Sequence, residues 1–298
     1  MKRLLWRVAI CHVMMVLFMG VAALRASAQQ PDIPSVGFKE IIQDGVAVGI
    51  WCPSGGPITR KTLGPFDVSY ADNGNPLNGF YPIVLISHGI GGQYRNHHLT
   101  ATRLVQDGNV VIAPTHARDL QVNRSATISR MEFRQHDLTA ALVAVTSDPL
   151  ISRVVNLEKV RAVGYSLGSA SVLIASGARF DTQKLVTHCD KHSSEDRNFC
   201  SWVTPGFWRS VWDWLAGDEE AREGIYETST PLLTGDIVLV APIGQGLDLA
   251  RVNETDSKIQ VLALGGDREV VPLFHAKPLM TTVAFDKINY IEYPNVHH

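Results

Sequence analysis

The 298-residue sequence has little charge and no excess of either sign. Charged residues make up 19% of the chain, and 27 Lys and Arg stand against 29 Asp and Glu, for a net charge of −2. A chain without a basic excess has no field to attract nucleic acid. Internal repeats and low-complexity segments are missing, and the 45% hydrophobic content is that of a globular protein. A small-molecule partner is therefore the expected class of ligand.

Long apolar runs are missing after the N-terminus. Residues 8–24 are almost wholly apolar, follow three basic residues, and precede the small-x-small pattern of Ala26 and Ala28. This order predicts a secretory signal peptide at residues 1–28. An uncleaved membrane anchor is the alternative, although the run is short for a span of about 20 residues. We therefore expect a secreted or periplasmic protein that keeps no stable membrane span after cleavage.

Cysteines are few, and their spacing does not resemble a zinc site. Cys11 would be removed with the signal peptide, and an exported chain can form disulfides. Cys189 and Cys200 lie close together in a polar stretch and are the disulfide candidate. Cys52 would then be free or buried.

Strand patterns and helix patterns alternate through most of the chain. Residues 31–82 are rich in Gly, Pro and Asn and predict an antiparallel edge, with a strand-like run at 47–51. Beyond it, alternating strands and helices predict βαβ units with right-handed crossovers, so the expected fold class is α/β with a mostly parallel sheet. The expected strands are 82–87, 110–113, 160–163, 237–241, 259–264 and 288–293, and the expected helices are 96–107, 133–148 and 168–179.

Residues 181–233 interrupt this alternation. They hold four tryptophans, the two cysteines of the candidate disulfide and many charges. One interpretation is a cap over the C-terminal edge of the sheet, which would shape an apolar pocket for an acyl group. The other is a helical excursion whose tryptophans fill its own core.

The pentapeptide Gly-Tyr-Ser-Leu-Gly at residues 164–168 fits the pattern Gly-x-Ser-x-Gly. It follows a buried strand and opens a helix of small residues, which is the context of a nucleophile elbow. The Ser166 hydroxyl would project at the helix N-terminus, where free N–H groups and the helix dipole favour negative charge. A plain turn between strand and helix is the alternative.

Two backbone N–H groups must converge to form an oxyanion hole. Leu167 follows the nucleophile and would supply one, and Ile90 in the loop 88–92 is the candidate for the other. That loop could also be an ordinary glycine-rich connection. His88 is expected to shape the loop rather than to take part in catalysis. For the segment 115–119 we expect a salt-bridged structural loop, with substrate positioning as the alternative.

A serine nucleophile needs a histidine to accept its proton and a carboxylate to orient that histidine. In this arrangement the acid follows the serine along the chain and the histidine comes last. Asp267 follows the strand 259–264 at its C-terminal end, where ligands bind in open α/β sheets. Asp248 and Asp236 are weaker candidates.

The base is one of the two histidines that end the chain, His297 or His298. A doubly wound hydrolase normally carries a helix after this histidine, so we expect the C-terminus to be truncated. A longer tail could also hold a partner for the odd cysteine.

Four loops together resemble the dienelactone-hydrolase-like branch of the α/β-hydrolases, close to the platelet-activating-factor acetylhydrolases. The resemblance covers residues 45–298 and is weak over 181–233. It implies the α/β-hydrolase fold and esterase activity on short or oxidised acyl chains without a cofactor. The small-small-His-aromatic pattern of the family favours His298 as base. The four loops are 87–92, 115–119, 164–168 and 266–272.

The sequence departs from this family in two places. Tyr165 stands where relatives usually have histidine before the serine. True dienelactone hydrolases use a cysteine nucleophile, so the resemblance does not extend to their lactone chemistry. We expect a serine esterase at residues 29–298, with a small-molecule ester as partner. The alternatives are a peptidase or acyltransferase on the same fold, or a non-catalytic lipid-binding relative.

Overall fold

The computed structural model describes residues 35–71, 74–120, 128–204 and 224–298. The predicted signal peptide at residues 1–28 lies outside these ranges, as do residues 205–223 of the expected cap. None of the helices within the described ranges is both long and apolar enough to cross a membrane.

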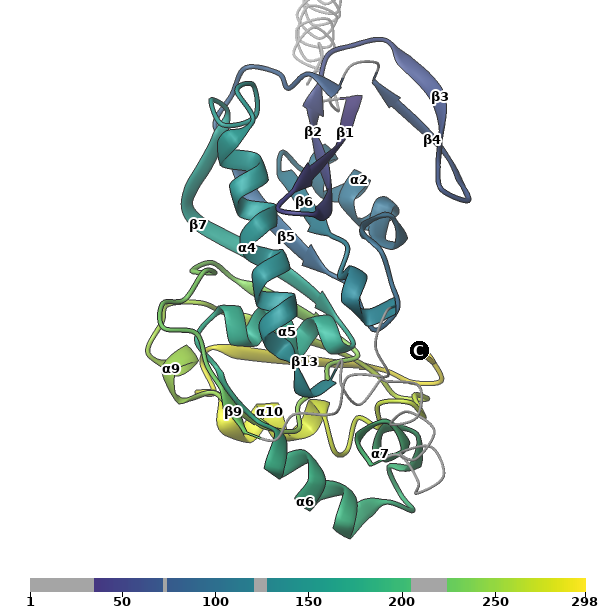
Figure 1. The fold of residues 1–298 in the computed structure, drawn as a ribbon, viewed down its shortest axis with the longest axis vertical. Coiled ribbons are helices and arrows are strands. Elements are labelled where there is room, and N and C mark those ends of the chain that lie inside the picture. Colours follow the sequence, from purple (N-terminus) through teal and green to yellow (C-terminus); the bar gives the residue numbers. More distant parts are fainter. Residues whose placement is uncertain (1–34, 72–73, 121–127, 205–223) are drawn as a thin grey trace, which may run out of the picture. The chain divides into compact units, whose positions relative to one another are not determined.

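A ten-stranded sheet organises the described residues (Figure 1). Six neighbouring strands run parallel to one another, and a set of four N-terminal strands continues the sheet in mixed orientation. From edge to edge the strands are β13 (Ile288–Tyr293), β12 (Ile259–Leu264), β10 (Ile237–Val240), β7 (Val155–Tyr165), β5 (Tyr81–Ser87), β6 (Val110–Pro114), β2 (Val46–Ser54), β1 (Ser35–Gln43), β4 (Phe66–Ala71) and β3 (Ile58–Leu63).

The central strands are buried on both faces, as continuous apolar runs predict. On β5, Ile83 and Leu85 join one hydrophobic cluster, and Val84 and Ile86 join another. The first cluster includes residues of α4 (Met131–Ser147) and α5 (Leu167–Ala175), and the second includes residues of α2 (His98–Gln106). Helices therefore cover both faces of a mostly parallel sheet, so the predicted α/β class holds.

Shorter elements complete the described chain. The 3-10 turns η2 (Tyr94–His97) and η3 (Ala117–Leu120) follow β5 and β6. The expected cap region contains β8 (Arg179–Asp181), α6 (Thr182–His192), α7 (Arg197–Val203) and β9 (Ile225–Tyr226). β8 pairs with β9 and with β11 (Leu247–Asp248), and α9 (Ala250–Asn253) and α10 (Ala276–Thr282) flank the last strands.

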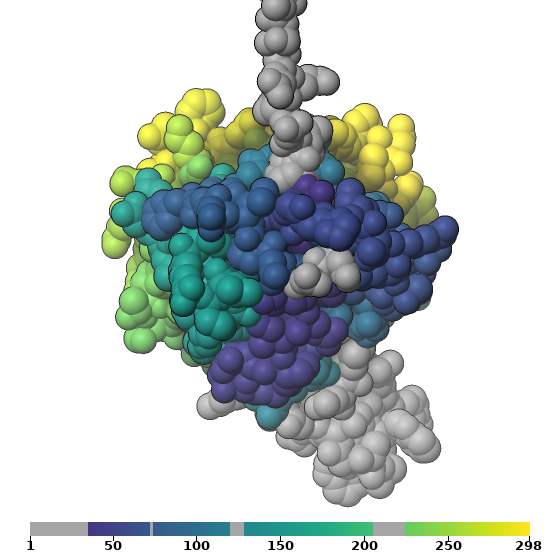
Figure 2. All heavy atoms as spheres, turned by 90° about the horizontal axis from the view of Figure 1, so that it is seen from above, coloured from purple at the N-terminus to yellow at the C-terminus, as the bar shows by residue number. Residues whose placement is uncertain are grey.

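The N-terminal strands form a face of their own. In Figure 2 the purple and blue segments of β1 to β4 face the viewer, and the yellow C-terminal segment lies behind them. Tyr94 and Trp51 pack with Phe38 in an aromatic group beneath these strands. The turn-joined pairs β1–β2 and β3–β4 are antiparallel, as the turn-rich composition predicts, whereas β1 lies parallel to β4.

Candidate active site

Ser166 occupies the turn between the end of β7 and the start of α5. Its backbone angles are φ 54° and ψ −123°. A positive φ is strained for a residue other than glycine, and such strain is held in place by the surrounding structure. Here the Ser166 N–H donates to the Val240 carbonyl at 2.9 Å, and the Ser169 hydroxyl donates to the Gly164 carbonyl at 2.8 Å. The turn is therefore braced on both sides of the serine.

The two glycines of the motif allow β5, β7 and α5 to approach closely. A Cβ on Gly164 would lie 2.6 Å from the Gly168 carbonyl oxygen, and a Cβ on Gly168 would lie 2.0 Å from the Ser87 carbonyl oxygen. Both distances are below any real contact, and the atoms in the way belong to the backbone. The two glycines of the pattern Gly-x-Ser-x-Gly are therefore required by close backbone packing, which any side chain at either position would prevent.

Asp267 and His298 are joined by a hydrogen bond. His298 Nδ1 lies 2.9 Å from Asp267 Oδ2, and the Asp267 side chain is 1% exposed. The other carboxylate oxygen accepts the N–H groups of Glu269 at 2.8 Å and Val270 at 3.2 Å. Burial raises the pKa of Asp267, but these hydrogen bonds and the nearby His298 outweigh burial and hold the pKa below its usual value. The residue is therefore an ionised partner for the histidine.

The His298 ring lies against the residue that precedes Ser166. The ring centroids of Tyr165 and His298 are 4.9 Å apart, and Tyr165 also contacts the His97 ring at 5.5 Å. Because Asp267 engages Nδ1, Nε2 is the remaining ring nitrogen that can exchange a proton. Within the described residues Ser166 Oγ makes no hydrogen bond to His298. Such bonds are often long in a ligand-free site and tighten when substrate binds.

His297, the alternative base, does not contact Asp267 in this way. Its ring lies over Gly266, where an added Cβ would come within 2.7 Å of it. Of the two terminal histidines, the structure thus brings His298 to the acid.

The weaker acid candidates lie elsewhere. Asp236 precedes β10 and accepts the Lys258 N–H at 2.9 Å. It therefore lies at the N-terminal ends of the parallel strands, opposite the end that carries Ser166. Asp248, at the end of β11, accepts the Ala250 N–H at 3.1 Å. Both carboxylates therefore have structural partners.

Two loops place the candidate oxyanion donors near Ser166. Leu167 is the first residue of α5, and an N–H at that position has no partner inside a helix. The 88–92 loop approaches the elbow closely, since a Cβ on Gly89 would lie 3.1 Å from Ser166 Cβ. Ile90 is the next residue in that loop. Both predicted donors thus belong to segments that meet at the serine.

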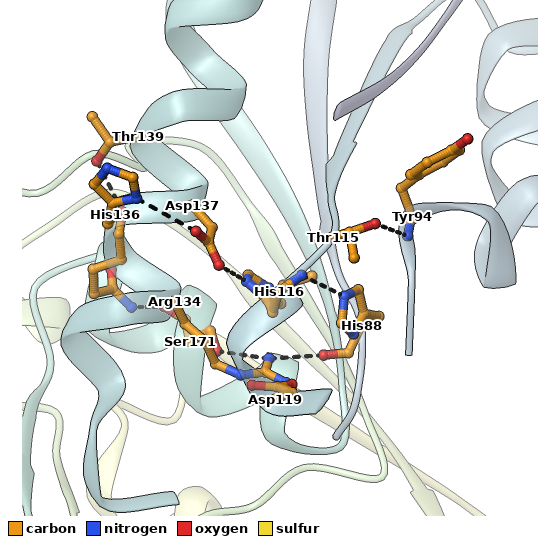
Figure 3. Close-up of polar contacts among 12 residues, drawn as sticks. His88, Tyr94, Thr115, His116, Asp119, Arg134, His136, Asp137, Thr139 and Ser171 are labelled. Atoms are coloured by element: carbon orange, nitrogen blue, oxygen red, sulfur yellow. Dashed lines mark hydrogen bonds and ion pairs between the residues drawn. The ribbon is translucent and has the colours of Figure 1, made fainter. Parts of the chain in front are cut away.

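His88 is buried and neutral. Its Nδ1–H donates to the Gly89 carbonyl at 2.7 Å, and its Nε2 accepts the His116 N–H at 3.0 Å (Figure 3). Burial and the neighbouring charge of Arg134 lower the pKa of His88 to about 3. Both ring nitrogens are occupied, so the residue shapes the loop as the sequence predicts.

A second set of Ser, His and Asp lies beneath the loop. Ser87 Oγ lies 3.0 Å from His116 Nε2, and His116 Nδ1 lies 2.9 Å from Asp137 Oδ2. Ser87 is 0% exposed and His116 is 1% exposed, so no substrate can reach the hydroxyl. The set holds β5, β6 and α4 together and is not a second active site.

Sequence reasoning missed the charged residues of α4 that face inward. Arg134 and Asp137 are buried on a helix whose polar residues look like a solvated face in the sequence. Arg134 pairs with Asp119, and Asp137 pairs with His116. Both partners belong to the segment 115–119, for which a salt-bridged loop was expected. The signal that could have found them is the cluster of charged and polar residues at 132–137, which begins a helix whose later turns are largely apolar.

No family model matches the chain, and no curated protein is significantly similar to it in sequence.

The expected cap contacts the loop that carries Asp267. Asp196, immediately before α7, accepts the Nε2–H of His188 and that of His275, each at 2.8 Å. Asn198 on α7 donates to the Arg268 carbonyl at 3.0 Å. These bonds join the α6–α7 pair to the segment 267–275. The expected tryptophans at 208, 212 and 214 lie outside the described residues, and Trp202 packs against the local hydrophobic cluster.

The two cysteines selected from the sequence are joined in a disulfide between α6 and α7. The Cα atoms of Cys189 and Cys200 are 5.2 Å apart. Cys52 is free and buried, and its thiol donates to the Gly74 carbonyl at 3.3 Å.

Within the described ranges, one group has the residue types and spacing to hold a metal ion, namely His188, Asp196 and Cys200. The sulfur of Cys200 is in the disulfide, so this group offers no thiolate ligand.

Proposed function

We propose that the chain is a serine hydrolase of carboxylic esters with the α/β-hydrolase fold. The observation that carries this proposal is the hydrogen-bonded pair of Asp267 and His298 beside the strained turn of Ser166. A nucleophile on a sharp strand-to-helix turn, followed along the chain by an acid and then a histidine, is the arrangement of this fold. The loop resemblance to platelet-activating-factor acetylhydrolases supports the same reaction class.

The proposed reaction has two steps. In the first, Ser166 Oγ attacks the ester carbonyl while His298 Nε2 accepts its proton, and the N–H groups of Ile90 and Leu167 bind the oxyanion. His298 then returns the proton to the departing alcohol, which leaves an acyl-serine. In the second step, water gives a proton to His298 and attacks this ester, and the acid product leaves as Ser166 regains its hydrogen. Asp267 stabilises the imidazolium in both steps.

The proposed substrate is a small ester with a short or lipid-like acyl chain, acted on outside the cytoplasm. Apolar residues from α5, the acid loop and the cap pack together near the serine, among them Leu167, Val270 and Phe199. A disulfide in the same region suits a protein exported by the predicted signal peptide.

Ser166→Ala tests the proposal. We expect the variant to lose several orders of magnitude in kcat toward p-nitrophenyl acetate and to lose covalent labelling by a fluorophosphonate probe, with an unchanged melting temperature. Ser176→Ala is the matched control, because Ser176 is a buried serine at the far end of α5. Equal hydrolysis by wild type and Ser166→Ala would reject Ser166 as nucleophile. Cleavage of matched amides faster than esters would instead indicate a peptidase.

A further inference from the structure

The carbonyl of Gly89 accepts three hydrogen bonds. The donors are His88 Nδ1 at 2.7 Å, the Gly92 N–H at 3.2 Å and Arg134 Nη2 at 3.3 Å. The Gly92 bond closes a tight turn over residues 89–92, in which Gly91 has φ 70°. A carbonyl with two lone pairs seldom has three donors, one of them a guanidinium. The feature therefore needs an explanation beyond the turn itself.

This carbonyl belongs to the same peptide group as the Ile90 N–H. The described chain has no cis peptide bond, and in a planar trans peptide the C=O and N–H bonds point in opposite directions. Fixing the Gly89 oxygen from one side therefore fixes the Ile90 N–H on the other. Donors on the oxygen also draw electron density from the nitrogen, so the N–H becomes a stronger donor.

Arg134 is held rigidly behind this peptide. The residue is 1% exposed, and its Nη1 donates to the His88 carbonyl at 2.9 Å and to Ser171 Oγ at 3.3 Å. Its Nη2 also forms a buried ion pair with Asp119. In Figure 3 the guanidinium lies between Asp119 and Ser171, and one dashed line joins it to the His88 carbonyl. A planar guanidinium holds its donor nitrogens at fixed separate positions, so its two Nη atoms can bind two successive carbonyls in one geometry.

We propose that Arg134 is a positioning residue for the oxyanion hole, which orients and polarises the Gly89–Ile90 peptide from behind. The inference rests on the proposed function, because it assigns Ile90 as a donor to the oxyanion. Arg134 does not touch the substrate and acts through this peptide. Asp119 keeps the guanidinium in place and balances its charge.

Arg134→Lys is the decisive variant. It keeps a positive charge beside Asp119, so no buried carboxylate is left unpaired, but its single nitrogen stands where the guanidinium carbon does and does not reproduce the two separate donors Nη1 and Nη2 to the carbonyls of His88 and Gly89. Removal of one oxyanion donor costs about 100- to 1,000-fold in kcat, and a misplaced donor should cost about 10- to 100-fold, with KM changed by less than about threefold. Arg251→Lys is the control, because Arg251 also donates to two carbonyls, those of Thr228 and Ser229, away from Ser166. It should keep wild-type kcat.

A thionoester substrate separates positioning from a general structural effect. Sulfur is a weak hydrogen-bond acceptor, so the wild type should hydrolyse the oxygen ester far faster than the matched thionoester. In Arg134→Lys this ratio should fall by the same factor as kcat, because the lost donor served only the oxygen. If the ratio is unchanged while kcat falls, Arg134 is structural and the proposal is wrong.

The amide signal of Ile90 gives a readout that does not depend on turnover. In NMR spectra of isotope-labelled protein, Arg134→Lys should shift the Ile90 amide proton upfield, and Arg251→Lys should leave it in place. A wild type that neither hydrolyses esters nor reacts with fluorophosphonate would refute the proposed function, whereas an unmoved Ile90 signal would refute this inference alone. If Arg134→Lys does not fold, the double variant Arg134→Met/Asp119→Leu, which removes both buried charges, undergoes the same measurements.

Discussion

The two kinds of histidine in the site differ in what their nitrogens contact. His298 has a carboxylate on Nδ1 and leaves Nε2 for proton exchange. His88 faces a carbonyl on one nitrogen and a backbone N–H on the other, so an added proton would have no acceptor. His88 is closer to the serine along the chain, but its contacts make it a loop-shaping residue. The role of a histidine is thus set by its hydrogen bonds and not by its place in a motif.

Acid should destabilise the protein through its buried neutral histidines. The pKa of His88 is about 3 in the folded state and 6.5 in the unfolded chain, so between these values only the unfolded chain binds the proton. Stability contributed by this residue is complete above pH 6.5 and falls as the pH is lowered toward 3, by about 1.4 kcal/mol per pH unit. In His88→Asn, the free energy of unfolding in urea should fall less steeply as the pH is lowered from 7 to 4. The difference in slope should correspond to the uptake of up to one proton fewer on unfolding. Burial also lowers the pKa of His116, so part of the slope should remain.

Ser176→Ala provides the control for this measurement, because it removes a buried polar side chain that does not titrate in this range. It should keep the wild-type slope. An equal slope in wild type and His88→Asn would mean that His88 is not held neutral in the folded protein.

At the scale of elements, prediction succeeded where burial leaves a strong pattern. The strands expected at 82–87, 110–113 and 259–264 match β5, β6 and β12 closely, because strands covered on both faces are apolar throughout. The helix expected at 168–179 ends earlier, at Ala175, since Gly177 adopts φ 107° and the chain then enters β8. The small sheet of β8, β9 and β11 was not predicted, because strands of two or three residues show no alternation.

The α6–α7 pair should depend on its disulfide. The covalent bond closes a loop of 11 residues, which restricts the unfolded chain and contributes about 2–3 kcal/mol by loop-closure arguments. We expect Cys189→Ser/Cys200→Ser to lower the free energy of unfolding in urea by that amount. Cys52→Ser is measured in the same way, with the disulfide reduced and with it intact, to identify any effect of the free thiol on the free energy of unfolding. If reduction of the wild type leaves its unfolding curve unchanged, the disulfide contributes nothing to stability.

At the scale of the molecule, the candidate site is assembled from the C-terminal ends of parallel strands. Loops after β5, β7, β12 and β13 carry Ile90, Ser166, Asp267 and His298, which are separated by up to 208 positions in sequence. Parallel strands bring these ends to one end of the sheet, and for this reason motif order and strand position could predict candidate residues on loops that lie together there. The hydrogen bond from Arg134 to the Gly89 carbonyl could not be predicted, because it depends on which polar residues of α4 point into the protein.

The predicted signal peptide at residues 1–28 would be removed on export, and the folded domain would then begin after it. A chain that begins at Gln29 should therefore fold with the same melting temperature as the full-length protein and hydrolyse p-nitrophenyl acetate equally well. Expressed with its own N-terminus in a secreting host, the protein should appear outside the cytoplasm with an intact mass that starts at Gln29, because the Ala-Ser-Ala pattern ends at residue 28. A secreted product that retains the first 28 residues would favour the membrane anchor instead. A lower melting temperature for the shortened chain would show that the apolar run packs on the folded domain.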